Sequence, residues 1–399
     1  MQGQRVSSPY PPVPPVPLSG PSLPHRLQSF WLRVSAGMRL NELWDQLRSD
    51  ARSTYRLYAR EVDAARPSGT PRQKHFVHVA KQFFWAILEK LTPARRILLL
   101  VALVLLVLPQ AEMVGNPGQH WEFRFEAHLL GGLLMFGLLI LELTDRVVMK
   151  RDLQIAKEIQ AWLLPARPPQ VPGLEIAFAT RPANTVAGDY YDVFPRRTSD
   201  GSAPGATSQT FLIAVADVAG KSVPAAMLMA TIQASLRALC TTPGPVTELV
   251  TRMNRYACSN SQNGRRFTTA FIAEYDPASH VLQYVNAGHN PPVLRRRSGT
   301  TEELSAGGLP LGVMEDARYE FGTVSLEPGD LLAAYTDGLV EAENARTEEY
   351  GEARFLNLLQ TMAAAPADVI LGSVLIDIDR FVGSAPQHDD VTLMLLKAA

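Results

Sequence analysis

The chain has 399 residues, which is long enough for two or more domains that each bury a core of their own. Its 38 basic and 39 acidic residues leave a formal net charge of −1, so no electrostatic footprint for nucleic acid is present, and we expect no nucleic-acid partner. Cys240 and Cys258 are its 2 cysteines and form no CxxC pair, which argues against a disulfide or zinc scaffold.

Residues 1–28 are predicted to form a disordered, proline-rich tail. The run from Pro11 to Pro17 is rich in proline and has no apolar core of the kind that a signal peptide needs. Residues 29–94 are predicted to form cytoplasmic amphipathic helices, the second of which has an apolar stripe rich in phenylalanine, with lysines around it. Such a helix suits a membrane surface, and packing against a neighbour in a soluble bundle is an equally good reading.

Two apolar runs, 97–111 and 127–141, predict a two-helix transmembrane hairpin over residues 95–143. Lysines and arginines lie before the first run and after the second, whereas the connecting loop is mainly acidic. This asymmetry predicts a multi-pass protein of the inner (cytoplasmic) membrane, with both termini and the C-terminal domain in the cytoplasm. Each run is shorter than the roughly 18 to 20 residues of a full span, and a soluble dimerising hairpin is the alternative.

Residues 144–164 continue the helical pattern and are predicted to form a linker or switch helix. Leu141, Val148, Ile155 and Trp162 recur every seventh residue, but the companion heptad positions are partly polar. This half-formed seam indicates either a weak homodimer through residues 141–164 or a helix that docks on the following domain. Pro165 ends the helix.

Residues 165–399 read as one α+β domain. Strands are expected at 174–180, 187–194, 210–216, 267–275, 280–287, 292–297, 319–325, 330–335 and 391–397. Helices are expected at 223–241, 245–260, 351–363 and 366–381, and residues 196–209 are expected to form a polar surface loop.

Short aspartate-bearing motifs recur in this domain, most of them with a glycine beside the aspartate. They are Gly188-Asp189-Tyr190-Tyr191-Asp192, Asp217-Val218-Ala219-Gly220-Lys221, Tyr335-Thr336-Asp337-Gly338 and His388-Asp389-Asp390-Val391-Thr392. Carboxylates at strand ends suit hard cations such as Mg²⁺ or Mn²⁺, and glycine permits a close backbone approach. Each motif alone is more often a turn.

The order of these motifs resembles the metal-dependent protein phosphatases of the PPM (type 2C) class, and within it the bacterial SpoIIE/RsbU branch. The resemblance runs from Leu163 to Lys397 and includes the blocks 215–226, 286–292 and 335–342. It implies a four-layer α-β-β-α sandwich, with two antiparallel sheets between helix layers, over residues 165–399.

The resemblance also implies a set of site residues. Asp217 is the expected bridging metal ligand, with the Val218 backbone carbonyl beside it; Asp337 and Asp389 complete the shell of a second ion; and Asp189 holds the first. For Asp192 and Asp390 a supporting or turn role is as good a reading as ligation. Arg181 is a candidate for binding the substrate phosphate; the alternative is that it is an ordinary surface residue at a strand end.

Two further positions lie within blocks of the resemblance. His289 lies in a Gly-His-Asn-Pro loop, where a turn role is favoured over that of a general acid. Ser222 stands where relatives often carry glycine, so the turn after Asp217 is expected to be tight.

The implied function is that of a membrane-tethered serine/threonine protein phosphatase using two Mn²⁺ or Mg²⁺ ions. Such a pair of ions turns water into the nucleophile near neutral pH, so no protein nucleophile is required. The implied substrate is a phosphorylated signalling protein, a STAS-type antagonist of an anti-sigma factor. The alternatives are a catalytically inactive pseudophosphatase acting as a membrane scaffold, and a sensor or transporter formed by the N-terminal half.

Overall fold

A computed structural model describes most of the chain from residue 84 onward and divides the chain into two compact units, Met1–Glu142 and Leu143–Ala399. The residues described are 84–85, 88–89, 91–108, 112–113, 123–124, 127–199, 207–261 and 266–399. The predicted tail over 1–28, and the amphipathic helices of 29–94 up to residue 83, lie outside them.

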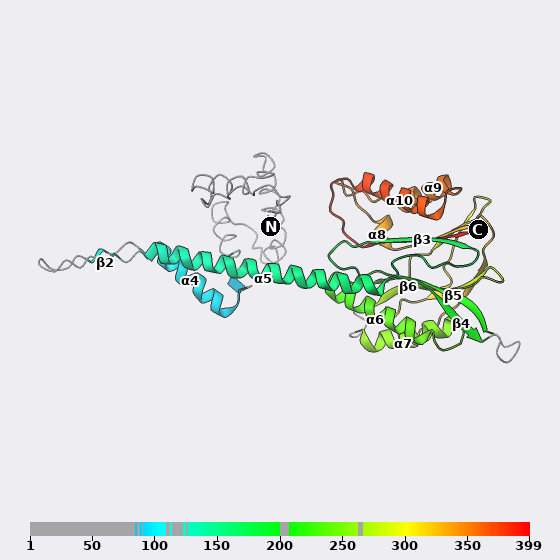
Figure 1. Ribbon diagram of the computed structural model, residues 1–399, viewed down its shortest axis with the longest axis horizontal. Helices are drawn as coiled ribbons and strands as arrows, with labels where there is room; N and C mark the ends of the chain where they lie inside the picture. The colour runs from blue at the N-terminus through cyan, green and yellow to red at the C-terminus, as the bar shows by residue number, and fades with distance from the viewer. Residues whose placement is uncertain are drawn as a thin grey trace, which may run out of the picture. The chain divides into compact units, whose positions relative to one another are not determined.

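The described part of the first unit is built on two helices (Figure 1). Helix α4 (Pro93–Val107) begins with proline at its first position, where the missing N–H costs no hydrogen bond. Helix α5 (Ala127–Leu163) begins in this unit and continues into the second. The helices approach closely at Gly131, where an added Cβ would lie 3.0 Å from the Ala102 carbonyl oxygen. Between them, β1 (Glu112–Met113) pairs antiparallel with β2 (Phe123–Arg124).

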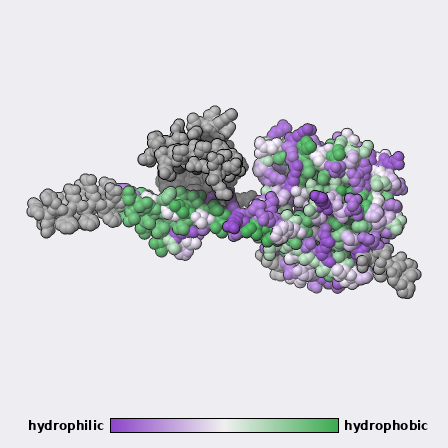
Figure 2. All heavy atoms as spheres, viewed as in Figure 1, coloured by the Kyte–Doolittle hydropathy of each residue, from purple (hydrophilic) through white to green (hydrophobic). Residues whose placement is uncertain are grey.

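Hydrophobic side chains cover the surface of α4 and of the first half of α5, as Figure 2 shows. Leu129, Leu133 and Phe136 are among the exposed ones. Within the described part of the chain, α5 alone is both long and apolar enough to cross a membrane, because α4 has 15 residues. The membrane hairpin therefore stays a prediction, whereas an unbroken helix through residues 144–163 agrees with the pattern of the linker.

The second unit contains two sheets. The order β10-β7-β6-β5-β4, with β11 paired to β7, forms one sheet, and the order β3-β13-β12-β8-β9 forms the other. The first comprises β4 (Tyr190–Ser199), β5 (Thr207–Val218), β6 (Thr268–Asp276), β7 (Val281–Ala287), β10 (Gly307–Gly308) and β11 (Gly322–Ser325). The second comprises β3 (Leu174–Arg181), β8 (Val293–Arg295), β9 (Thr301–Glu303), β12 (Leu331–Tyr335) and β13 (Val391–Ala398).

The sheets face each other, and each carries helices on its outer side (Figure 1). Helices α6 (Val223–Leu239) and α7 (Val246–Asn260) cover the first sheet, and α9 (Glu352–Met362) and α10 (Ala367–Val382) cover the second. The period of two along each strand explains the layers: in β5, Ile213 and Val215 pack between the sheets, whereas Leu212 and Ala214 pack on α6 and α7. The predicted α-β-β-α sandwich is confirmed.

Several details differ from the sequence-based prediction. Beside the antiparallel pairs, β10 pairs with β7 in parallel, and the short strands β9 and β10 and the one-turn helix α8 (Asp337–Val340) were not expected. The expected loop 196–209 is shorter, because β4 runs to Ser199 and β5 starts at Thr207. Arg196 explains the longer strand. Its guanidinium is buried and pairs with Glu274 at 2.7 Å instead of pointing into solvent, and this pair anchors the strand.

Candidate active site

Asp217 lies near the C-terminal end of β5, on the face that points toward the second sheet. The next residue, Val218, packs its side chain on the helix side, and its carbonyl oxygen faces Gly188. A Cβ at Gly188 would lie 3.2 Å from that oxygen and 3.8 Å from the Asp390 carboxylate. Glycine therefore lets three of the predicted motifs meet at one point.

Asp337 follows β12 and begins helix α8. The next residue, Gly338, lies so close to the segment before β13 that a Cβ there would be 2.1 Å from the Asp390 carbonyl oxygen. Any side chain at this position would push the turn away, so glycine is what brings Asp337 beside Asp389. The two motifs come together because β12 and β13 are neighbouring antiparallel strands.

Asp189 is buried and accepts two hydroxyl hydrogen bonds, from Thr336 at 2.9 Å and from Thr392 at 2.5 Å. Its pKa is well above the usual range, because burial disfavours the charged form and the Asp217 carboxylate adds repulsion. The two hydroxyls hold the carboxylate in place but supply no neutralising charge.

Asp390 anchors the loop that carries Gly188. One carboxylate oxygen accepts the Ala183 N–H at 2.7 Å, and the other accepts the Gly188 N–H at 2.6 Å. With both oxygens committed to backbone amides, Asp390 acts here as a support that joins the start of β13 to the loop before β4.

The gathered carboxylates repel one another. Burial and the charge of Asp337 raise the pKa of Asp217 to about 6, against an opposing hydrogen bond from Asp189. The pKa of Asp337 is raised by burial and by the charge of Asp389. Carboxylates crowded in this way favour any cation that can bind between them.

The donor set fits a hard divalent cation. The oxygen donors that meet here are carboxylates and hydroxyls, the ligands that Mg²⁺ and Mn²⁺ prefer, and the Val218 carbonyl lies at the same place. Among the described residues, no three His, Cys, Asp or Glu side chains already enclose a metal-sized position. The assignment of a cation site therefore rests on donor chemistry and mutual repulsion.

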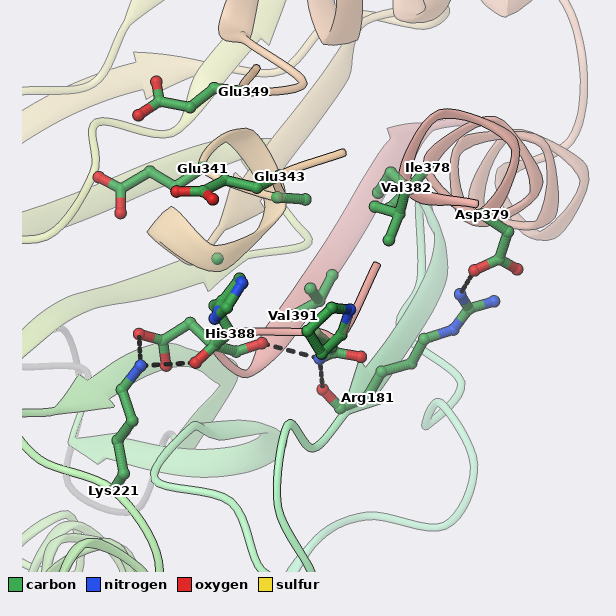
Figure 3. A pocket seen from close by; sticks show the side chains of 15 residues that line it. Arg181, Lys221, Glu341, Glu343, Glu349, Ile378, Asp379, Val382, His388 and Val391 are labelled. Carbon is green, nitrogen blue, oxygen red and sulfur yellow. Dashed lines mark hydrogen bonds and ion pairs between the residues drawn. The ribbon is translucent and has the colours of Figure 1, made fainter. Parts of the chain in front are cut away.

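A cavity of about 210 Å³ opens beside these carboxylates (Figure 3). Lys221 reaches it from the turn after β5, and its ammonium group lies 2.9 Å from the Asp389 carboxylate and 2.5 Å from the His388 carbonyl oxygen. Glutamates line another part of the wall: Glu341, Glu343 and Glu349. The pKa of Glu341 is raised, first by burial and then by the charge of Asp337.

Arg181, the predicted phosphate contact, lines the same cavity but is already paired. Its guanidinium forms an ion pair with Asp379 of α10, and Figure 3 shows it directed at that partner. Lys221 is paired as well, but its partner is Asp389, so its ammonium group lies beside the gathered carboxylates. The sequence analysis did not single out Lys221 as a site residue, although it stands inside the same motif as Asp217.

Asp192 is not brought together with the other aspartates. Its carboxylate is fully buried on the helix side of β4, where it accepts two N–H groups of Arg237, both at 2.9 Å, and the Tyr190 hydroxyl at 2.8 Å. Arg237 belongs to α6 and also stacks on the Phe194 ring, 3.8 Å from its centroid. Of the two readings that the sequence left open for Asp192, this environment matches the supporting one.

Gln160, near the end of α5, contacts the loop that carries Gly188. Its amide nitrogen donates to the Ala187 carbonyl at 2.7 Å, and its amide oxygen accepts the Ala187 N–H at 3.0 Å. The side chain is buried, which strengthens both bonds. The sequence analysis missed Gln160, and also Thr336 and Thr392; the latter two stand inside recognised motifs and could have been proposed as carboxylate partners.

The comparisons with known proteins agree with this architecture. Residues 207–399 match the family model described as Stage II sporulation protein E (SpoIIE). Phosphoserine phosphatase RsbU of Bacillus subtilis (strain 168) is 29% identical over 251 residues, covering 62% of this chain and 70% of RsbU. Phosphoserine phosphatase RsbP of the same organism is 25% identical over 195 residues, covering 48% of this chain and 46% of RsbP.

A solved structure shows the same fold. The SiaA-PP2C domain of Pseudomonas aeruginosa is 21% identical, covers 64% of this chain and 99% of that chain, and superposes with a TM-score of 0.54. The order of motifs, the two-sheet architecture and these similarities lead to one conclusion. Residues 207–399 belong to a SpoIIE-family domain of the PP2C-type serine/threonine phosphatases.

Proposed function

We propose that the chain hydrolyses phosphoserine or phosphothreonine on a signalling protein, using two divalent cations held by Asp189, Asp217, the Val218 carbonyl, Asp337 and Asp389. The observation that carries this proposal is the meeting of carboxylates from four separate motifs at one edge of the two sheets. Burial, and then the repulsion of Asp337, raises the pKa of Asp217 to about 6.

Each group of the chain has a distinct task in this proposal. Bound cations would supply a nucleophilic hydroxide from water near neutral pH and would neutralise phosphate charge. Asp217 and Asp337 hold them from opposite sheets, because β5 and β12 end side by side at this edge. The Thr336 and Thr392 hydroxyls fix the orientation of Asp189.

Lys221 would bind the phosphate of the substrate. Its ammonium group belongs to the cavity wall that also includes Asp389, so it can reach a phosphate at the cation site as a point charge. Glu341 and Glu349 are exposed and line one wall of the cavity. The substrate residues that flank the phosphoserine would lie against this wall.

The test is a phosphatase assay on residues 165–399 and on the full chain, with Mn²⁺ or Mg²⁺ and with EDTA. We expect turnover with either metal and none in EDTA. Asp217→Ala should abolish turnover and leave the fold largely intact, because it relieves repulsion among carboxylates. Turnover that persists in EDTA, or in Asp217→Ala, would contradict the proposal; no turnover under any condition would favour a pseudophosphatase.

The proposed substrate is a STAS-type antagonist of an anti-sigma factor, as the family resemblance implies. A phosphorylated STAS-domain protein should be dephosphorylated with a much higher kcat/KM than a phosphoserine peptide of the same local sequence, because a folded substrate can also contact the cavity rim. Equal kcat/KM values for the two would remove this partner class from consideration.

We also propose that α4 and the first half of α5 anchor the enzyme in the cytoplasmic membrane, with the catalytic domain inside the cell. The exposed apolar surface of these helices supports this proposal. In a cysteine-free chain, a cysteine at Gly118 should react with a membrane-impermeant reagent in intact cells, and one at Ser199 only after lysis. The reverse labelling, or full-length protein that stays soluble without detergent, would rule out the hairpin.

A homodimer through residues 141–164 remains part of the proposal. Val148, Ile155 and Trp162 lie on the heptad positions of α5 and are 52%, 45% and 80% exposed, so they are free to meet a second copy. Sedimentation of the full chain should show a dimer that Ile155→Asp weakens, and a monomer at every concentration would contradict it.

A further inference from the structure

Lys221 places a positive charge directly against the gathered carboxylates. The residue lies in the turn between β5 and α6, four positions after Asp217. Its ammonium group lies 2.9 Å from Oδ2 of Asp389 and donates a hydrogen bond to the His388 carbonyl oxygen at 2.5 Å. Figure 3 shows both contacts at the cavity wall. An ion pair therefore joins the motif of Asp217 to the motif of Asp389.

Both oxygens of the Asp389 carboxylate have a partner within the chain. Oδ1 accepts the Asp390 N–H at 2.9 Å, and Oδ2 pairs with Lys221. The main chain is held separately, because the Gln387 side-chain nitrogen donates to the Asp389 carbonyl at 2.7 Å and to the Arg181 carbonyl at 2.8 Å. The partners of Oδ1 and of the main chain are uncharged amides. Lys221 is the partner of Asp389 that carries the same sign of charge as a metal ion.

A divalent ion bound to Asp389 and the ammonium group of Lys221 repel each other. Mg²⁺ binds carboxylate oxygens at about 2.0–2.1 Å. With the ammonium group 2.9 Å from Oδ2, an ion on the same oxygen would lie at most about 5 Å from it. At this separation, like charges interact strongly near a protein surface. The lysine is the partner that can move, because its side chain is 53% exposed and has a flexible stem.

The cavity gives the displaced ammonium group a place to go. Lys221, His388 and Asp389 line the same cavity of about 210 Å³, so the His388 carbonyl stays within reach after the contact with Asp389 is lost. The ammonium group then lacks an anionic partner. A phosphate that enters the cavity to meet the bound cations can take the place of Asp389.

We propose that Lys221 is a built-in competitor for the cation site: it pairs with Asp389 until a divalent ion displaces it, and only then binds the substrate phosphate. This inference rests on the proposed function, because it assumes that Asp389 holds a cation and that phosphate binds beside it. The exchange of partners makes phosphate binding depend on prior metal binding. It also lowers the affinity for metal, so the concentration of free divalent ion regulates the site.

The first test is the affinity of the metal-stripped full chain for Mn²⁺, measured by calorimetry. Lys221→Met keeps the aliphatic stem and removes the charge. It should bind Mn²⁺ about 2- to 5-fold more tightly than wild type, which is the effect expected for a half-exposed ion pair. Lys221→Arg keeps the charge and should show no such gain.

The matched control is Arg181→Met, which removes a positive charge from the same cavity. The partner of Arg181 is Asp379, outside the proposed ligands, so its loss should leave the Mn²⁺ affinity within 2-fold of wild type, flagged here as about 2-fold. An equal gain in both variants would mean that the net charge of the cavity, not competition for Asp389, sets the affinity, and the inference would be overturned.

The second test is titration of the chain with inorganic phosphate at saturating Mn²⁺. Lys221→Met should bind phosphate about 10-fold more weakly than wild type, because a charge-assisted hydrogen bond is lost. The two effects of this one substitution have opposite signs, which a general disturbance of the site would not produce. The Mn²⁺ concentration for half-maximal turnover should fall in Lys221→Met, while kcat/KM at saturating Mn²⁺ also falls.

The outcomes separate this inference from the proposed function. Unchanged or weaker Mn²⁺ binding by Lys221→Met overturns the competition, and unchanged phosphate binding overturns the exchange of partners. In both cases a wild-type chain that binds Mn²⁺ leaves the proposed function standing. A wild-type chain that binds no Mn²⁺ removes the proposed function and this inference together.

Discussion

Asp192 and Asp217 are both acidic residues of the same sheet, yet their surroundings differ completely. Asp192 faces the helix layer, where Arg237 and the Tyr190 hydroxyl satisfy its carboxylate. Asp217 faces the second sheet, where Asp337, Asp389 and Asp390 add negative charge and Asp189 supplies a hydrogen bond. A buried carboxylate with its own cation stabilises a fold, whereas carboxylates gathered without enough positive charge form a site for a cation from solution.

The contrast arises from the two faces of the sheet. Even-numbered residues of β4, such as Tyr190 and Phe194, pack on α6 and α7, and Asp192 shares that face. Odd-numbered residues of β5 pack between the sheets. Asp217 lies on the same face of β5, past the apolar core, near the end of the strand. Two similar aspartate motifs thus have opposite roles because their register differs.

The largest effect is expected for Asp337→Asn, which keeps the shape and removes one charge. Metal-assisted stabilisation contributes several kcal/mol, so kcat/KM with Mn²⁺ should fall by about 10³-fold or more. The free energy of unfolding in EDTA should stay equal or rise, because burial and then the charge of Asp389 raise the pKa of Asp337 and so disfavour its charged form. Loss of stability in parallel with activity would mean that Asp337 is structural, as Asp192 is.

Arg237→Leu tests the other half of the comparison. It leaves Asp192, which is 0% exposed, without its cation, and breaking a buried pair in this way costs about 3–5 kcal/mol. Urea unfolding should show this loss, while the Mn²⁺ affinity of the folded protein stays at the wild-type value.

Asp192→Asn should cost less than Arg237→Leu, because the Arg237 side chain is 43% exposed and can turn to solvent. The double variant should therefore be more stable than Arg237→Leu alone. A strong loss of Mn²⁺ affinity in Asp192→Asn would break the comparison by placing Asp192 in the cation site.

A smaller loss of kcat/KM is expected when the contact between α5 and the Gly188 loop is removed. Gln160→Leu removes both hydrogen bonds to Ala187, one residue before Gly188, and should lower kcat/KM by about 10-fold through a looser Asp189 loop. Gln154→Leu, on an exposed position of the same helix, is the matched control and should keep wild-type activity. Equal activity of the two variants would show that the contact only fixes the helix.

The same contact supports a coupling hypothesis. Because α5 is continuous from Ala127 to Leu163, we propose that a change at its first half is transmitted along the helix to Gln160. Replacing residues 144–157 with a flexible Gly/Ser stretch should give the full chain the kcat/KM of the isolated domain. If wild type, linker variant and isolated domain all have the same kcat/KM in matched detergent, the N-terminal half is an anchor only.

The smallest effect concerns Ser222, in the turn between β5 and α6. Its φ of 66° and ψ of −151° lie in a region that glycine adopts without strain, and its hydroxyl makes no capping bond. Ser222→Gly should therefore raise the free energy of unfolding by about 1 kcal/mol. Urea unfolding measures this, and a destabilised variant would indicate that the hydroxyl has a partner that outweighs the backbone strain.

Much of the fold followed from local patterns. The strand that ends near Asp217, the strand that ends at Tyr335 and the helices over the C-terminal domain were predictable, because apolar runs, glycines and apolar periodicity mark them. The extension of β4 past Phe194 was not, because Arg196 is charged and only its partner Glu274 on β6 explains its burial.

The carboxylates of the site could be predicted from the sequence, but most residues that hold them in place could not. Asp189, Asp217, Asp337 and Asp389 stand in recognisable motifs, but their neighbours come from distant elements. Gln160 reaches the Gly188 loop from a helix that the sequence marks only as a linker. The His289 ring, in the segment after β7, lies 3.1 Å from the Thr269 hydroxyl of β6. Such contacts depend on the packing of layers, which no local pattern encodes.

The most direct test of the cation site is calorimetric titration of the metal-stripped full chain with Mn²⁺, for wild type, Asp217→Ala and Asp192→Asn. We predict saturable binding in wild type, no binding at the same concentrations in Asp217→Ala, and near wild-type affinity in Asp192→Asn. Absence of Mn²⁺ binding in wild type, or equal binding by Asp217→Ala, would contradict the conclusion that the gathered carboxylates are a cation site.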